Sequence, residues 1–328
     1  MTERSVWYQI RPNKFVDRRI FMDFLCRYTN LEKDRRYFYA SMGASHLVDH
    51  NQFYRLTGIN RLYSFDGDEA LIPRQIVNRP IGTTICERLM SNELPERLQS
   101  LYDSFIDATN SIIWLDFTTV DRFQQLQELV ELLKLSRSGD VIRITMNSHP
   151  GNLGGISDYQ ARGHATPGHL RAEQAQANLG EFFEAKFDRV TSTNFPKVLS
   201  HAVKLAIAKA QDELWLGDAA AGLLTTYQDG QRMFTATLLI HDAASPQPAL
   251  REWEFWPADW DDVLEINVPE LSAKEKFVLD QHLGEDPDQI IERVNFLPGE
   301  DMDSAMQNLA SYKKLHRFVP AFQHVDFA

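Results

Sequence analysis

Residues 36–50 read RYFYASMGASHLVDH, a short apolar and aromatic run that passes through a glycine into a stretch of helical composition. Three similar runs follow it, RLYSFDGD at 61–68, SIIWLDFT at 111–118 and DVIRITMN at 140–147. Short apolar runs rich in aromatic and β-branched residues predict buried strands, and the longer segments between them have the periodicity of helices. The sequence therefore predicts βαβ units on a mostly parallel sheet.

The segments after the third run predict a crossover helix and the far side of the sheet. Residues 120–139 carry leucines at helical spacing, and we expect Gly139 to cap that helix at its C-terminus. A second helix is predicted over residues 195–214. Residues 222–242 contain an Asp-Gly pair between two apolar, β-branched runs, which predicts an antiparallel hairpin. The predicted fold is α/β and Rossmann-like, with a mostly parallel sheet closed by an antiparallel hairpin.

We expect one α/β domain over residues 1–245 and a C-terminal appendage over residues 246–328 that packs on it. Residues 151–197 are rich in glycine and lack a sustained strand pattern, so we interpret them as an insertion that forms a lid over the sheet. In the appendage, Ser272 and Glu275 have the spacing of a capping box and predict the start of a helix.

Acidic side chains are concentrated in one part of the chain. The net charge is −12, and residues 251–305, with sixteen acidic and four basic side chains, carry a net charge of the same size. Binding of long nucleic acids needs a basic surface, so we do not expect nucleic acid as a partner. The acidic segment is either a solvated surface or a surface for a protein partner.

The cysteine spacing and the lengths of the apolar runs indicate in which cellular compartment the protein is expected. Cys26 and Cys86 do not have the CxxC or CxxH spacing of a zinc site. No apolar run reaches the length of about 18 residues needed to span a bilayer, and the first residues lack the apolar core of a signal peptide. We therefore expect a cytoplasmic protein without a membrane segment.

Candidate ligand-binding residues follow the first two predicted strands. Gly43, followed by Ser45, stands at a strand-to-helix turn, where a residue without a side chain lets the backbone approach a ligand. Asp66 lies about 20 residues further on, the separation expected of a carboxylate that binds ribose hydroxyls, and Asp68 competes with it for this role. The alternatives are that Gly43 only ends a strand and that the acidic cluster only supports a helix dipole.

The third and fourth predicted strands also end in polar residues. We expect Asp116 to orient a substrate or remove its proton. Asn147 and His149 reach the same edge of the sheet, Asn147 as a substrate contact and His149 as a base, a ligand contact or a loop histidine. His164 and His169 follow, but the carboxylates that would complete a metal site are not recognisably spaced, so we expect no metal.

The segment YQIRPNK at residues 8–14 places two cations beside a Pro-Asn turn. Arg11 and Lys14 could hold an anionic group of the substrate. The alternative is that they brace the acidic loop from Asp66 to Glu69.

The order of these strands, with Gly43, Asp66 and Asp116 at their carboxyl ends, resembles the S-adenosylmethionine-dependent methyltransferases of the Rossmann class. The resemblance covers residues 36–150 and implies S-adenosylmethionine as the cofactor. The glycine series of the usual first motif is reduced to one glycine, which also disfavours NAD. WLDFTT stands where DNA amino-methyltransferases have NPPY or DPPY, so the resemblance does not imply methylation of DNA adenine.

More narrowly, YQIRPNKFVDR at residues 8–18, followed by MGASHLVDH and SFDGDE, is similar to a group of bacterial O-methyltransferases. This similarity implies methyl transfer to an oxygen of a small molecule or another acceptor that it does not identify. Two alternatives stay open: a non-catalytic nucleotide-binding or protein-interaction module with a degenerate methyltransferase fold, and another enzyme acting on a nucleotide or nucleoside.

Overall fold

The computed structural model describes residues 11–157, 159–242 and 249–320. Contacts between residues divide the chain into two compact units. The core unit contains residues 24–226 and 231–264, and the terminal unit contains residues 1–23, 227–230 and 265–328. The predicted domain boundary at 245/246 and the first three residues of the YQIRPNK segment lie outside the described residues.

Within the described residues, eight strands form one sheet in the order β3-β2-β1-β4-β5-β7-β6-β8. Strands β1 to β5 pair in parallel, and β7 pairs antiparallel with β5. The strands are β1 Tyr37–Met42, β2 Leu62–Asp66, β3 Ile85–Arg88, β4 Asn110–Asp116, β5 Val141–Asn147, β6 Gly217–Asp229, β7 Gln231–Asp242 and β8 Leu264–Ile266. The predicted α/β fold, a mostly parallel sheet closed by an antiparallel hairpin, is confirmed.

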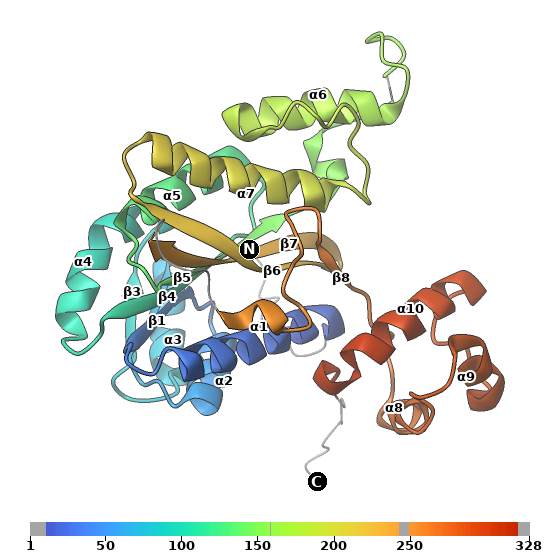
Figure 1. The fold of residues 1–328 in the computed structure, drawn as a ribbon, viewed down its shortest axis with the longest axis horizontal. Helices are drawn as coiled ribbons and strands as arrows, with labels where there is room; N and C mark the ends of the chain where they lie inside the picture. The colour runs from blue at the N-terminus through green and yellow to red at the C-terminus, as the bar shows by residue number, and fades with distance from the viewer. Residues whose placement is uncertain (1–10, 158, 243–248, 321–328) are drawn as a thin grey trace. The chain divides into compact units, whose positions relative to one another are not determined.

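Helices cover both faces of the sheet in the core unit (Figure 1). Side chains of β1 alternate between the faces: Phe38 contacts Tyr102 of α4 (Leu94–Ser104) edge to face, whereas Tyr39 stacks on Phe53 of α2 (Val48–Thr57) with ring centroids 4.4 Å apart. The core-unit helices are α2 Val48–Thr57, α3 Ile72–Asn78, α4 Leu94–Ser104, α5 Arg122–Leu135, α6 Pro167–Leu179 and α7 Phe195–Asp212. Helix α1, Pro12–Leu31, begins in the terminal unit and ends in the core unit.

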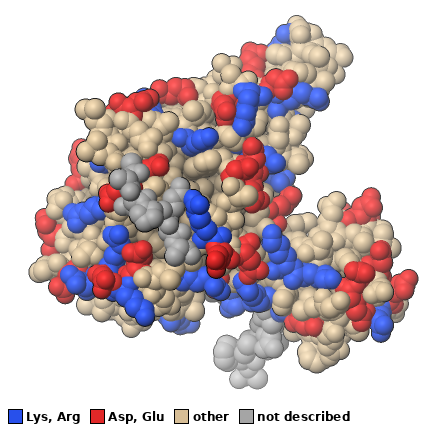
Figure 2. All heavy atoms as spheres, in the orientation of Figure 1, with Lys and Arg blue, Asp and Glu red and all other residues tan. Residues whose placement is uncertain are grey.

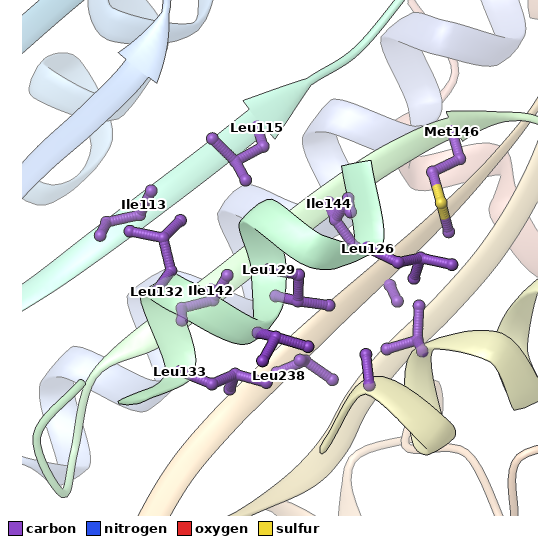
Figure 3. Packing of buried hydrophobic residues seen from close by; sticks show 14 of the residues in the cluster. Ile113, Leu115, Leu126, Leu129, Leu132, Leu133, Ile142, Ile144, Met146 and Leu238 are labelled. Carbon is purple, nitrogen blue, oxygen red and sulfur yellow. The ribbon is translucent and has the colours of Figure 1, made fainter. Parts of the chain in front are cut away.

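The main apolar core lies between the sheet and the helices α4, α5 and α7. Leu126, Leu129 and Leu133 of α5 are fully buried and pack over β4 and β5 (Figure 3). Ile142 and Ile144 of β5 point toward this helix and are also buried. The leucines at helical spacing therefore form the apolar face that the sequence predicts. The polar residues of interest lie beyond this core, at the ends of the strands.

Two local features differ from the sequence-based expectations. Strand β3 was not predicted, because ICER is short, only partly buried and half polar. Helix α5 ends at Leu135, where the N–H of Ser136 donates to the carbonyl of Leu133. The expectation that Gly139 caps this helix is wrong: Gly139 has a φ of 94° in the loop before β5, and its N–H donates to Ile240 O at 2.8 Å.

The terminal unit links the start of α1 to the C-terminal helices α8 Ala273–Asp280, α9 Pro287–Val294 and α10 Met302–Leu315. Asn13 Nδ2 donates to Asp229 Oδ1 at 3.0 Å, and Asn13 Oδ1 accepts the N–H of Val268 at 2.8 Å. The predicted capping box of Ser272 and Glu275 is confirmed at the start of α8.

The charges on the surface and the composition of the described helices are relevant to binding partners and to membrane insertion. On the face drawn in Figure 2, acidic and basic side chains are interspersed. Among the described helices, none has both the length and the apolar composition required to cross a bilayer.

Candidate functional site

The strand order changes direction between β1 and β4. From β1 the sheet continues through β2 and β3 on one side, and from β4 through β5 on the other. Open α/β sheets bind ligands outside the carboxyl ends of the strands at such a point, because the flanking loops diverge there. Gly43 follows β1, Asp66 ends β2, and Asp116 and Asn147 end β4 and β5. The structure therefore brings these predicted site residues to one edge of the sheet.

The loop between β1 and α2 is strained. Ala44 and Leu47 have φ values of 45° and 48°, in the left-handed region that favours glycine. Such residues cost about 1–3 kcal/mol each and cluster at ligand-binding sites. Leu47 is also the N-cap of α2, and it makes no side-chain cap hydrogen bond. The amino end of α2 therefore directs main-chain N–H groups and the positive end of its dipole toward the strand edge.

Gly43 is required by the packing of this loop. A Cβ atom at this position would overlap Ser64 Oγ on β2 and the side chain of Leu47. The glycine thus lets β1 and its loop lie directly against β2. A contact between the Gly43 backbone and a ligand stays a prediction, and a larger side chain here would disturb the fold as well as any binding.

Three buried polar atoms, in β1, in the loop after it and in α3, lack hydrogen-bond partners in the described part of the chain. They are Ser41 Oγ, Ser45 Oγ and Gln75 Nε2, in residues that are at most 2% exposed. Ser64 Oγ donates to Gln75 Oε1 at 3.0 Å, and Asn78 Nδ2 donates to the carbonyl of Ser45 at 2.9 Å, so the surrounding side chains are held in place. Buried polar groups are nearly always hydrogen-bonded, and a ligand or bound water would supply the partners that these three atoms lack.

The two candidate carboxylates after β2 have different surroundings. Asp66 is partly buried, and its Oδ1 accepts the N–H of Asp68 at 2.9 Å. Burial raises the pKa of Asp66, against the smaller lowering effect of that N–H. Asp68 is exposed, and its Oδ1 caps a short 3-10 helix by accepting the N–H of Ala70 at 3.0 Å. Asp66 is therefore the better placed of the two to accept hydrogen bonds from a ligand.

Asn147 and His149 are already engaged in local hydrogen bonds. Asn147 is buried, and its Oδ1 accepts the N–H of His149 at 3.0 Å and Asn152 Nδ2 at 3.0 Å. His149 is exposed, and its Nδ1 accepts the N–H of Gly151 at 3.1 Å. In a neutral imidazole the accepting nitrogen is the one that would act as a base. Asp116 is partly buried at the end of β4.

Sequence reasoning assigned no role to Arg122, the first residue of α5, although its side chain is fully buried. Its Nε donates to Asn147 O at 2.7 Å and its Nη2 to Asn147 Oδ1 at 3.3 Å. Its Nη1 donates to Asn178 Oδ1 at 2.9 Å and to Val120 O at 3.3 Å. These partners are neutral, and burial lowers the pKa of Arg122 to about 10. A cation in the first turn of a helix, where the dipole disfavours it, was the available sequence signal.

The two candidate cations, Arg11 and Lys14, are not among the residues at the strand ends. Arg11 and Lys14 belong to the terminal unit, where the main-chain N–H of Lys14 donates to Asp229 Oδ2 at 2.7 Å. Their assignment to a substrate stays a prediction.

The histidines have separate partners. His164 Nε2 is 2.7 Å from Glu173 Oε2, and His169 Nδ1 is 2.8 Å from Thr166 Oγ1. Among the residues that the structure describes, no group of three His, Cys, Asp or Glu side chains could hold a metal ion.

Solved structures similar to this chain have low sequence identity. A complex of Trm1 from Pyrococcus horikoshii with S-adenosyl-L-methionine is 10% identical, with a TM-score of 0.41, over 91% of this chain and 82% of that chain. Cofactor-bound Rv0187 from MTB is 16% identical, with a TM-score of 0.34, over 66% of this chain and 78% of that chain. A variant of LepI, in complex with SAH and a substrate analogue, is 11% identical, with a TM-score of 0.35 over 63% of this chain.

The match covers 43% of LepI, so this chain spans less than half the length of that protein. No curated protein matches the sequence.

A comparison with models of protein families gives a match over nearly the whole chain. The sequence model of the family described as "Putative O-methyltransferase" matches residues 6–327. This match agrees with the resemblance carried by YQIRPNKFVDR, the turn after β1 and the acidic end of β2. The chain belongs to this O-methyltransferase family.

Proposed function

We propose that the protein transfers the methyl group of S-adenosylmethionine to an oxygen atom and that the cofactor binds at the β1–β2 edge of the core unit. One observation carries the proposal: Ser41 Oγ, Ser45 Oγ and Gln75 Nε2 are buried without hydrogen-bond partners among the described residues, beside a strained loop. The cofactor has hydroxyl, amino and carboxylate groups that can pair with such atoms. Family membership supports the class of reaction.

Residues at this edge would each have a defined task. Asp66 accepts hydrogen bonds from the ribose hydroxyls, and Asp68 keeps the loop after β2 in place through its helix cap. Gly43 and Ser45 hold the main chain close to the cofactor. When bound, the cofactor supplies an electrophilic methyl group on a positively charged sulfur.

The acceptor side of the site lies at β4 and β5. Asp116 ends β4, next to β1 in the sheet, and we assign it to orienting the acceptor or removing its proton. His149 would contact the acceptor through Nε2, because Nδ1 is engaged with Gly151. Most of the rate gain would come from orientation of the two reactants. Residues 151–197 would form a lid that excludes water.

Location and partners extend the same proposal. The sequence has only Cys26 and Cys86, which do not argue for a disulfide framework, so we propose a reducing compartment and a cytoplasmic protein. The similarity of the N-terminal segment supports a bacterial source. The acceptor would be a small molecule, and the acidic residues 251–305 would offer a surface to a protein partner.

Calorimetry on the full chain tests this function. We expect S-adenosylmethionine and S-adenosylhomocysteine to bind, and NAD and ATP to bind far more weakly. Binding of NAD in preference to both adenosyl sulfur compounds would contradict the proposal. Binding of S-adenosylhomocysteine together with failure to transfer labelled methyl groups to any acceptor would instead favour a non-catalytic nucleotide-binding module.

A further inference from the structure

We propose that the methyl acceptor is a small carboxylate, held as an anion by Nε2 of Gln231, and that Arg122 orients Gln231 through Asn147. The inference rests on the proposed function and adds the chemical class of the acceptor. Arg122 is a positioning residue in this scheme, whereas Gln231 touches the acceptor.

The orientation of both carboxamides follows from groups that can only donate. Asn147 Oδ1 lies 3.3 Å from Arg122 Nη2 and 3.0 Å from the main-chain nitrogen of His149. Guanidinium and main-chain N–H groups have no acceptor capacity, so this Asn147 atom must be the oxygen. Asn147 Nδ2 is then a donor, and it bonds to Gln231 Oε1 at 3.1 Å. Asn152 Nδ2 donates to the same Gln231 oxygen at 3.3 Å.

Gln231 is therefore left with its N–H groups available. The side chain is exposed, and its Nε2 makes no hydrogen bond within the described residues. Gln231 opens β7, two residues before Met233, the register partner of Asn147. Because β7 runs antiparallel to β5, this donor lies at the carboxyl edge of the sheet, where β4 ends at Asp116.

The charge of Arg122 favours an anion at this edge. The guanidinium is fully buried, and within the described residues its hydrogen bonds go to neutral oxygens of Asn147, Asn178 and Val120. Arg122 has no counter-ion among the residues that the structure describes, and a buried charge of this kind is weakly screened, so it acts over a longer distance than a surface charge does. An anionic acceptor beside Gln231 would compensate it.

A carboxylate suits the site better than an alcohol. A carboxylic acid is ionised at neutral pH, since its ordinary pKa is about 4, whereas an alcohol must lose a proton to become a strong nucleophile. The nitrogen of His149 that could take this proton already accepts the N–H of Gly151. A carboxylate needs no base at all, so in this scheme Asp116 keeps only the first of its two proposed tasks, orienting the acceptor.

The reaction balances without a further reactant. One carboxylate oxygen forms a bond to the methyl carbon through its lone pair while the carbon–sulfur bond breaks. The electron pair of that bond stays on sulfur. The products are a neutral methyl ester and a neutral thioether, and no proton moves. Gln231 would hold the second carboxylate oxygen during this step.

Nuclear magnetic resonance on the full chain saturated with S-adenosylhomocysteine tests the inference. The probes are formate and benzoate, with benzamide as the neutral analogue of benzoate. We expect both carboxylates to shift the side-chain NH₂ signal of Gln231 and benzamide to leave it in place. In Gln231→Glu, the new carboxylate still accepts from Asn147 and Asn152 but repels the probe, so benzoate should bind roughly tenfold or more weakly.

Matched variants separate this role from a structural one. Gln99→Glu makes the same charge change at an exposed position on α4 and should bind benzoate like the wild type. Arg122→Lys, which keeps the charge, should retain part of the benzoate affinity that Arg122→Met loses. If Arg122→Met does not fold, the Gln231→Glu and Gln99→Glu pair decides the question.

The inference would be overturned if neither carboxylate changes the chemical shift of the Gln231 side-chain NH₂ group, or if benzamide changes it as much as benzoate does. These results would leave the proposed function in place as long as S-adenosylhomocysteine binds. Failure of S-adenosylhomocysteine to bind the wild-type chain would count against the proposed function itself.

Discussion

The main chain at Gly43 passes so close to Ser64 that a β-carbon on the glycine would overlap the serine hydroxyl oxygen. The same β-carbon would also overlap the side chain of Leu47. Gly43→Ala should therefore lower the free energy of unfolding by about 1–3 kcal/mol, the usual cost of overpacking, in a urea titration. Gly82→Ala is the control, because nothing lies within 4 Å of a Cβ at Gly82. Equal stability of the two variants would contradict this packing.

Asp66 should make cofactor binding sensitive to acid. Burial raises the pKa of its carboxyl group, and ribose hydroxyls donate to the ionised form. The affinity for S-adenosylhomocysteine should therefore be full above this raised pKa and fall as the pH decreases through it. Asp66→Asn should weaken binding by about 1–3 kcal/mol at neutral pH and remove this part of the pH dependence, as measured by calorimetry.

Asp66 should make the stability of the ligand-free protein change with pH in the opposite direction to its affinity for S-adenosylhomocysteine. A carboxyl group whose pKa is higher in the folded state binds its proton more tightly there, so its ionisation opposes folding. Relative to Asp66→Asn, the wild type should gain stability as the pH falls through the raised pKa. If the wild type instead loses stability relative to Asp66→Asn over this pH range, the raised pKa of Asp66 is contradicted.

Residues 151–166 should become resistant to protease when the site is filled. Gly154 and Gly163 have φ values of 137° and 80° in this segment, and α6 follows it from Pro167. Arg122 anchors the far end of α6 through Asn178. Limited proteolysis should cut this segment in the ligand-free protein, and S-adenosylhomocysteine with benzoate should slow the cut. Cleavage at the same rate with both ligands would make the segment an ordinary surface loop.

Local sequence signals predicted most of the fold. The first two and the last two parallel strands, the leucine-rich helix α5 and the β6–β7 hairpin all have periodic patterns that extend over several residues. Strand β3, Ile85–Arg88, has no such pattern because it is short and only partly buried. Gly139 resembled a helix cap, but the loop before β5 requires its positive φ instead.

The candidate site was predictable only where it follows strand ends. Gly43, Asp66 and Asp116 share an edge because parallel strands end together. Arg122 and Gln231 are joined to Asn147 by hydrogen bonds between residues far apart in the chain, and no local pattern encodes such bonds. Ser41 could not be predicted as a site residue either, because a serine in a strand carries no ligand-binding signal by itself.

The most direct test of the cofactor site is calorimetry of S-adenosylhomocysteine binding to the double variant Ser41→Ala, Ser45→Ala. The two hydroxyls have no partner in the described structure, so their removal should leave the stability of the ligand-free protein unchanged or slightly raised. Affinity should fall by roughly tenfold or more, because each hydroxyl would lose a bond to the cofactor. Wild-type affinity in the double variant, with the fold intact, would contradict the placement of the cofactor at this edge.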